Sequence, residues 1–124
     1  MMSRLIFISI FICLIGKASA EPTTPSLIQP NNGETLEDSN KHAMEYFGCI
    51  KSQAIKYVKT GESVEAISKA SVVSCESFIP MIAASNIYYL NSSQDGKSQF
   101  VERLHSDGER LAAKFAMDEK LKRK

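Results

Sequence analysis

The chain has 124 residues, with 15 Lys and Arg against 14 Asp and Glu, and three cysteines. This near-neutral balance excludes the strongly basic field that nucleic-acid binding calls for. The length is enough for one domain and too short for two.

Residues 1–20 have the three parts of a secretory signal. Arg4 gives a short positive region, residues 5–15 are almost wholly apolar, and Ala18 and Ala20 are the small residues that precede a cleavage site. The apolar run is shorter than the roughly 20 residues of a membrane-spanning helix. We expect cleavage after residue 20 and export to the periplasm or the medium, with no membrane span left; the alternative is an uncleaved N-terminal anchor.

Cleavage would change both the charge and the cysteine count. Removing Arg4 and Lys17 takes Lys and Arg from 15 to 13 against 14 acidic residues, so the net charge falls from +1 to −1. Cys13 would leave with the signal. The remaining pair, Cys49 and Cys75, is the even number expected of an exported protein with one disulfide.

The first elements of the mature chain are a leader and a helix. Residues 21–34 contain three prolines and no helical period, which predicts a flexible leader or an extended arm before a single domain at 35–124. Thr35 is a suitable cap for a helix over 35–59, and Gly61 would stop it. The predicted inner stripe of this helix is Ala43, Phe47, Ile50, Ala54, Tyr57 and Val58.

The second half predicts three further helical segments. Ser63 caps a helix over 63–78, and Pro80 either kinks it near Ile79 or separates it from a helix over 80–91. A loop precedes a last helix over 97–122. The inner positions of these segments are Val64, Ile67, Ser71, Cys75, Phe78, Ile82 and Tyr89, then Phe100, Leu104, Gly108, Leu111 and Phe115. No segment alternates with a period of two, so we predict an all-α helical bundle.

Cys49 and Cys75 are placed to join the two arms of a helical hairpin. Each lies thirteen residues from Glu62 in the predicted turn. At ~1.5 Å per residue their heights differ by roughly 3 Å, within reach of a disulfide. A redox-active pair is the alternative, but the Cys-x-x-Cys spacing is missing. We predict a structural disulfide.

Motifs for chemistry are few. Glu102 and His105 form one Glu-x-x-His, whereas a di-iron bundle needs this motif twice. There is no Gly-x-Ser-x-Gly elbow, phosphate-binding loop or zinc spacing. We expect neither an enzyme, nor a cofactor, nor a metal site; an exported enzyme with an unfamiliar site is the rival. Asn91-Ser92-Ser93 matches the N-glycosylation pattern and also reads as ordinary turn residues.

The most unusual stretch is 77–94, eighteen residues without a charge. One explanation is a helix buried between the first and last helices. The other is that Met81, Ala84 and Tyr88 face a partner, because Met and Tyr are enriched at interfaces. The run is too short and too interrupted to span a bilayer.

Residues 46–75 resemble a pattern found in small uncharacterised exported bacterial proteins with a single disulfide across a helical hairpin. The pattern consists of Cys49, Ala54, Tyr57, the Gly-Glu-Ser turn, Ile67, Ala70 and Cys75. The resemblance implies the stapled hairpin and no activity. The sequence therefore favours an exported, non-enzymatic accessory protein, inhibitor- or immunity-like, that binds another protein. A self-associating structural protein is the alternative.

Overall fold

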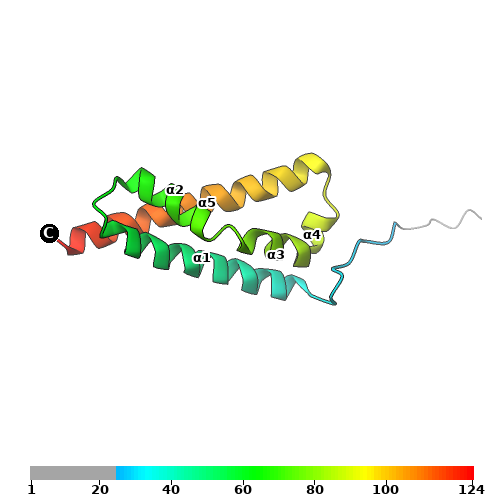
Figure 1. Cartoon of the computed structure of the whole chain (residues 1–124). Helices are drawn as coiled ribbons and strands as arrows, with labels where there is room; N and C mark the ends of the chain where they lie inside the picture. The colour runs from blue at the N-terminus through cyan, green and yellow to red at the C-terminus, as the bar shows by residue number, and fades with distance from the viewer. Residues whose placement is uncertain (1–24) are drawn as a thin grey trace, which may run out of the picture.

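The protein is an all-α bundle in which the first, second and last helices pack against one another and the third helix packs on the first. The computed structural model describes residues 25–124, and the predicted signal at 1–20 lies outside the described residues. The helices are α1 (Leu36–Val58), α2 (Val64–Ser74), α3 (Phe78–Ser85), α4 (Ile87–Leu90) and α5 (Gln94–Lys122). Figure 1 shows α1 and α5 close together near the C-terminus and α5 rising away from α1 toward α4. The predicted all-α class is confirmed.

Helix α1 forms as predicted from its capping signals. The Thr35 hydroxyl accepts from the Asp38 N–H, and the Asp38 carboxylate accepts from the Thr35 N–H in return, which completes a capping box. The Thr35 N–H and the Thr35 hydroxyl both donate to this carboxylate, at 2.7 and 2.9 Å, and hold the pKa of Asp38 below its usual value. Gly61 has a φ of +78°, so the turn after α1 uses the backbone freedom of glycine.

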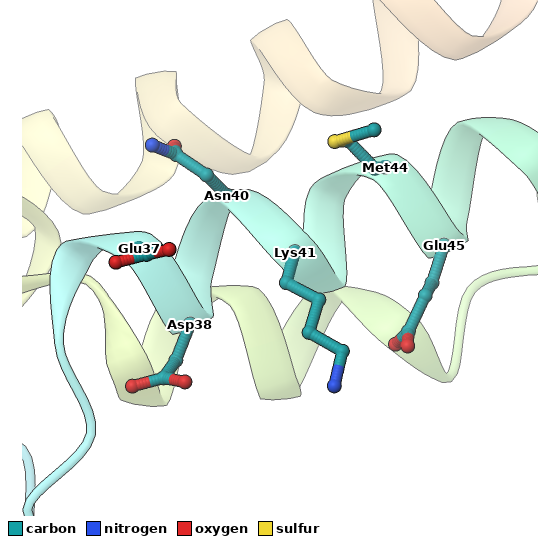
Figure 2. A pocket seen from close by; sticks show the side chains of 6 residues that line it. All are labelled: Glu37, Asp38, Asn40, Lys41, Met44 and Glu45. Atoms are coloured by element: carbon teal, nitrogen blue, oxygen red, sulfur yellow. The ribbon is translucent and has the colours of Figure 1, made fainter.

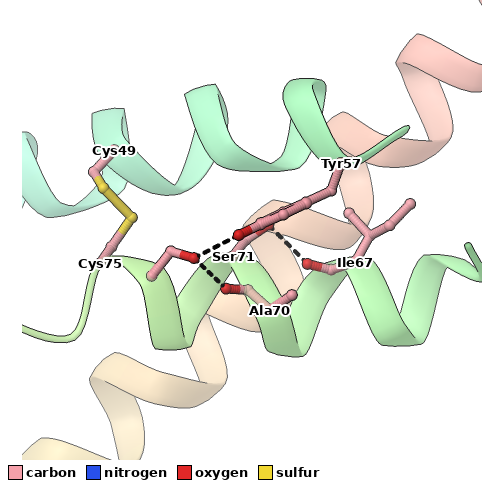
Figure 3. Close-up of a disulfide and its surroundings, with 7 residues drawn as sticks. Cys49, Tyr57, Ile67, Ala70, Ser71 and Cys75 are labelled. Atoms are coloured by element: carbon pink, nitrogen blue, oxygen red, sulfur yellow. Dashed lines mark hydrogen bonds between the residues drawn. A yellow bond between two sulfur atoms is a disulfide. The ribbon is translucent and has the colours of Figure 1, made fainter. Parts of the chain in front are cut away.

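The hairpin of α1 and α2 is closed by the predicted disulfide. Cys49 and Cys75 are bonded, with their Cα atoms 6.0 Å apart. The Tyr57 hydroxyl lies 2.9 Å from the Ser74 hydroxyl and adds a polar link between the same helices (Figure 3). At the turn, Lys120 of α5 donates to the Glu62 carbonyl at 2.6 Å. The hairpin is therefore held by contacts between its two helices and by a hydrogen bond from α5 to its turn.

The helix after the hairpin turn ends earlier than the sequence predicted. Helix α2 ends at Ser74, and α3 begins at Phe78 after a 59° bend. Pro80 is the third residue of α3, where a missing N–H costs no intrahelical bond. The Glu76 carbonyl, which Pro80 cannot serve, accepts from the Ile79 N–H at 3.0 Å. Of the two alternatives for Pro80, separate helices are confirmed.

A second break, at Asn86, was not predicted. Asn86 caps α4 by accepting from the Tyr89 N–H at 3.0 Å, and its amide nitrogen donates to the Ser39 hydroxyl at 3.2 Å. Ser39 in turn donates to the Ile82 carbonyl at 3.0 Å. Ser39 and Asn86 are both buried. This buried polar chain pins the α3–α4 junction to the start of α1.

Helix α5 begins at Gln94, three residues earlier than predicted, because Ser93 is its cap and accepts from the Gly96 N–H. Its fully buried positions are small: Gly108, Ala112 and Ala116, at four-residue spacing. The larger predicted residues Phe100, Leu104 and Phe115 flank this line and are only partly buried. Small residues let α5 approach α1 and α2 closely, and at Gly108 the neighbouring side chains are Tyr46, Ile50 and Val72.

Candidate functional site

The residues predicted to face a partner lie on the surface of α3 and α4. Met81 is 45% exposed, Tyr88 is 69% exposed, and Ala84 is exposed as well. The opposite side of α3 packs on α1 through Ile79 and Ile82, which are buried. The expectation that this segment is covered on two sides is therefore wrong, because α5 rises away from it (Figure 1).

The break at Asn86 changes how these three residues relate to one another. A continuous helix over 80–91 would have placed Met81, Ala84 and Tyr88 on one face. Instead, Met81 and Ala84 belong to α3, and Tyr88 belongs to the short α4. They form two neighbouring exposed positions on α3 and one beyond the bend.

The leader runs beside this surface as an extended arm. Residues 25–30 have no regular structure and end in a turn at 31–33. Leu27 and Ile28 are 60% and 58% exposed, whereas Pro30 is buried. The arm therefore adds two exposed apolar side chains to the surface, and its proline is buried.

Asn91 connects the arm to the end of α4. Its side-chain oxygen accepts from the Ile28 N–H at 2.8 Å, and its side-chain nitrogen donates to the Ile28 carbonyl at 2.9 Å. The same nitrogen donates to the Ile87 carbonyl at 2.8 Å. Both amide hydrogens are thus engaged, so attaching a sugar to this nitrogen would remove one of the two bonds.

Ala84 of α3 lines a hollow together with residues of the arm. The hollow between the arm and the helices is lined by Ile28 and Ala84 together with Leu90, and by polar residues of the arm and its turn, Gln29, Asn31, Asn32 and Glu34. Ile28 and Ala84 of this lining are exposed and apolar, and Leu27, Met81 and Tyr88 are exposed apolar residues of the same arm and helices. We call these five residues the arm–α3 surface. This is our candidate interaction site.

A larger hollow lies on the outer side of the first half of α1. Its lining residues are Glu37, Asp38, Asn40, Lys41, Met44 and Glu45, all from this one helix (Figure 2). Because no second element supplies a facing wall, the hollow is an open face rather than a cleft. Asp38 is already committed to the capping box.

The two histidines each lie near carboxylates. His42 Nδ1 is 3.3 Å from Glu45 Oε2, and its Nε2 is 3.4 Å from Glu34 Oε1. His105 Nε2 is 3.7 Å from Glu76 Oε1, so the carboxylate beside it comes from the link between α2 and α3 and not from Glu102. Within residues 25–124, no group of three or more His, Cys, Asp or Glu is placed to hold a metal ion.

The strongest shift in acidity belongs to a core residue. Burial raises the pKa of Tyr46 to about 12, and the negative charges of Glu76, Glu109 and Asp107 add to the effect. Its side chain is fully buried and its hydroxyl donates to the Leu104 carbonyl at 3.2 Å. The raised pKa is therefore a consequence of burial in the core and does not mark a functional site, because this hydroxyl is not accessible to solvent.

The sequence located part of this site. Met81, Ala84 and Tyr88 were singled out by the absence of charge from 77 to 94, and all three are exposed. The contribution of the arm was missed. Ile28 and Asn91 are 63 residues apart, and no local pattern in a sequence announces a bond between them.

Comparisons with protein-family models, with curated proteins and with solved structures found no match to this chain. Among residues 25–124, no single helix is long and apolar enough to cross a membrane; only α2 and α3 taken together reach that length and composition, and they are bent by 59°.

Proposed function

We propose that this chain is an exported, non-enzymatic accessory protein that binds another protein through the arm–α3 surface. An inhibitor- or immunity-like role fits a small stapled body that presents exposed apolar residues on its arm, α3 and α4. The observation that carries the proposal is the exposure of Met81 and Tyr88, at 45% and 69%, beside the exposed Leu27 and Ile28 of the arm.

Export is supported by the sequence of residues 1–20 and by the disulfide. Bonds between cysteines persist in oxidising compartments and are rare in the cytosol. The bond between Cys49 and Cys75 is therefore in keeping with an exported protein.

Binding to a protein is supported by the chemistry of the surface. Exposed apolar groups gathered in one place are a common mark of interaction sites, and Met and Tyr are frequent in them. The 77–94 segment adds no charge to the face that it forms. A matching partner surface would accordingly be apolar and free of unpaired charge.

The export part is tested by the intact mass of material recovered outside the cytoplasm. A chain that begins at Glu21 and resists alkylation until it is reduced would support it. A mass that retains residues 1–20, or alkylation of Cys49 or Cys75 without reduction, would contradict it.

The binding part is tested by photo-crosslinking in the cells that make the protein. A crosslinking side chain at position 88 should capture a discrete protein, and Tyr88→Ala with Met81→Ser should weaken its binding in a pull-down. Val73, which is 68% exposed on α2, gives the control Val73→Ala. Equal losses for the two sets of substitutions, or capture of copies of this chain alone, would count against the proposal.

A further inference from the structure

The Asn91 side chain forms the same two backbone hydrogen bonds with Ile28 that a residue of a neighbouring strand would form. Its primary amide pairs with the N–H and the C=O of the same residue, at 2.8 and 2.9 Å. Residues of antiparallel strands exchange the same two bonds across a hydrogen-bonded pair. Asn91 therefore recognises the backbone of an extended chain. The Ile28 side chain is 58% exposed, so the contact does not select for a particular side chain at this position.

Selectivity at this site comes two residues later. Pro30 is buried, whereas Leu27 and Ile28 remain largely exposed. In peptide recognition by added strands, main-chain bonds hold the segment and pockets for particular side chains select it. Here the main-chain bonds are those of Asn91, and the side chain that is buried is the one of Pro30. The arm is therefore an example of a segment that fits this site. It is extended and has a proline two residues after Ile28, the residue that Asn91 binds.

The arm holds this place by contacts that another segment could replace. Both bonds between Asn91 and Ile28 are exposed to solvent, where water competes for the same groups. The arm joins α1 through the turn at 31–33, in which Gly33 has a φ of +69°. A change of backbone angles in this turn would release residues 25–30 without disturbing α1, whose capping box starts only at Thr35.

We infer that the Asn91 clamp and its hollow form a binding site for an extended peptide segment of a partner protein, with a proline two residues after the clamped position. The arm occupies this site in the isolated chain and competes with the partner. The inference rests on the proposed function and gives it a partner chemistry, since Ala84 lines the hollow and also belongs to the arm–α3 surface. Leu27 and Ile28 would leave with the arm, so the partner would contact the helical part of that surface, Met81, Ala84 and Tyr88.

The test uses a fluorescent peptide of sequence Thr-Pro-Ser-Leu-Ile-Gln-Pro-Asn, which copies residues 24–31. The full chain carries Ile28→Pro, which removes the N–H that the arm donates to Asn91. By fluorescence anisotropy, we expect the peptide to bind this variant more tightly than the unchanged chain, whose arm competes. A peptide with an N-methyl group on its isoleucine should bind about tenfold more weakly, because it lacks the donor.

Two outcomes would overturn the inference: no binding of the peptide to the Ile28→Pro chain, or equal binding of the methylated and unmethylated peptides. The methylated peptide tests the bond to Asn91 without any substitution at Asn91, so the result does not depend on the folding of an Asn91 variant. Sedimentation shows whether the site is occupied by a second copy of this chain. If the unchanged chain forms a dimer and the peptide dissociates it, the occupant is the arm of the second copy, and the inference of a partner protein is wrong.

The two proposals fail separately. If the peptide does not bind while crosslinking at position 88 still captures a partner, the peptide site is wrong and the proposed function stands. If the peptide binds and no partner is captured, the site exists and the proposed function loses its support.

Discussion

Gly108 of α5 lies directly against the Tyr46 hydroxyl of α1. A Cβ built on this glycine would stand 2.8 Å from the tyrosine oxygen, 2.8 Å from Ile50 Cδ1 and 3.1 Å from Val72 Cγ2. Tyr46 donates to the carbonyl of Leu104, one helical turn before Gly108. The tyrosine therefore cannot move aside for a larger residue without losing its hydrogen bond.

Gly108→Ala should destabilise the protein although alanine favours helices. Overpacking costs about 1–3 kcal/mol, and the gain in helix propensity offsets up to about 1 kcal/mol of it. Gly48→Ala is the matched control, because Gly48 is exposed within α1 and has no atom within 4 Å of a built Cβ. It should stabilise by about 0.5–1 kcal/mol. Urea midpoints that rise for both variants would show that α5 can shift to make room.

Tyr46 should make stability fall at alkaline pH. Its pKa in the folded chain is raised from 10.0 to about 12, so the folded state keeps a proton that the unfolded state loses. Its contribution is complete below pH 10 and is lost as the pH rises from 10 to about 12. Ultraviolet titration should show one of the four tyrosines losing its proton only near pH 12.

Tyr46→Phe tests this assignment. It removes the titrating group and one hydrogen bond, at a cost of about 0.5–1.5 kcal/mol near neutral pH. The decline of unfolding free energy between pH 10 and 12 should become shallower than in the unchanged chain. An identical decline in both proteins would place its cause elsewhere.

Breaking the disulfide should lower stability and leave the helices intact. Cys49 and Cys75 are 26 residues apart, and closing a loop of that size is worth about 3–4 kcal/mol on the chain-entropy model. Cys49→Ser with Cys75→Ser should therefore lower the denaturant midpoint while the far-ultraviolet dichroism of the folded protein stays helical. The unchanged chain under reducing conditions is the control and should behave alike. A midpoint that does not move would mean that the bond does not constrain the unfolded chain.

The parts of the fold that sequence predicted are those set by local signals. Thr35, Ser63 and Gly61 mark helix ends through their own side chains or backbone freedom, and the helices begin and end near them. The two cysteines were placed by counting residues from the turn. In each of these cases, the deciding contacts lie within a few residues or follow from helical rise.

The parts that were missed depend on partners distant in sequence. Asn86 breaks the helix because its amide reaches Ser39, 47 residues away. Tyr46 rather than Phe47 is the buried aromatic, because a glycine in α5 leaves room for it. The arm is held by an asparagine that the sequence presents only as a turn residue. Periodicity within one helix contains none of this information.

The buried link between Ser39 and Asn86 should be sensitive to removal of its hydroxyl. Ser39→Ala leaves the Asn86 side-chain nitrogen without its buried partner, which costs about 1–3 kcal/mol, whereas the Ile82 carbonyl keeps the Ser85 hydroxyl as a donor. Ser68→Ala is the control, since Ser68 is also buried but bonds only the Val64 carbonyl of its own helix. It should change stability little. If the two variants have the same midpoint, the α3–α4 junction is held by other contacts.

Two tyrosines of opposite exposure separate the core from the candidate interface. Tyr46 is fully buried, so Tyr46→Ala should cost about 3–5 kcal/mol, as for other large buried aromatics. Tyr88 is 69% exposed, and Tyr88→Ala should change the free energy of unfolding by no more than about 0.5 kcal/mol. Its effect should fall on partner capture instead. Chemical denaturation and a pull-down of each variant measure the two quantities in parallel. A large loss of stability for Tyr88→Ala with unchanged capture would return this side chain to the core and remove it from the interaction surface.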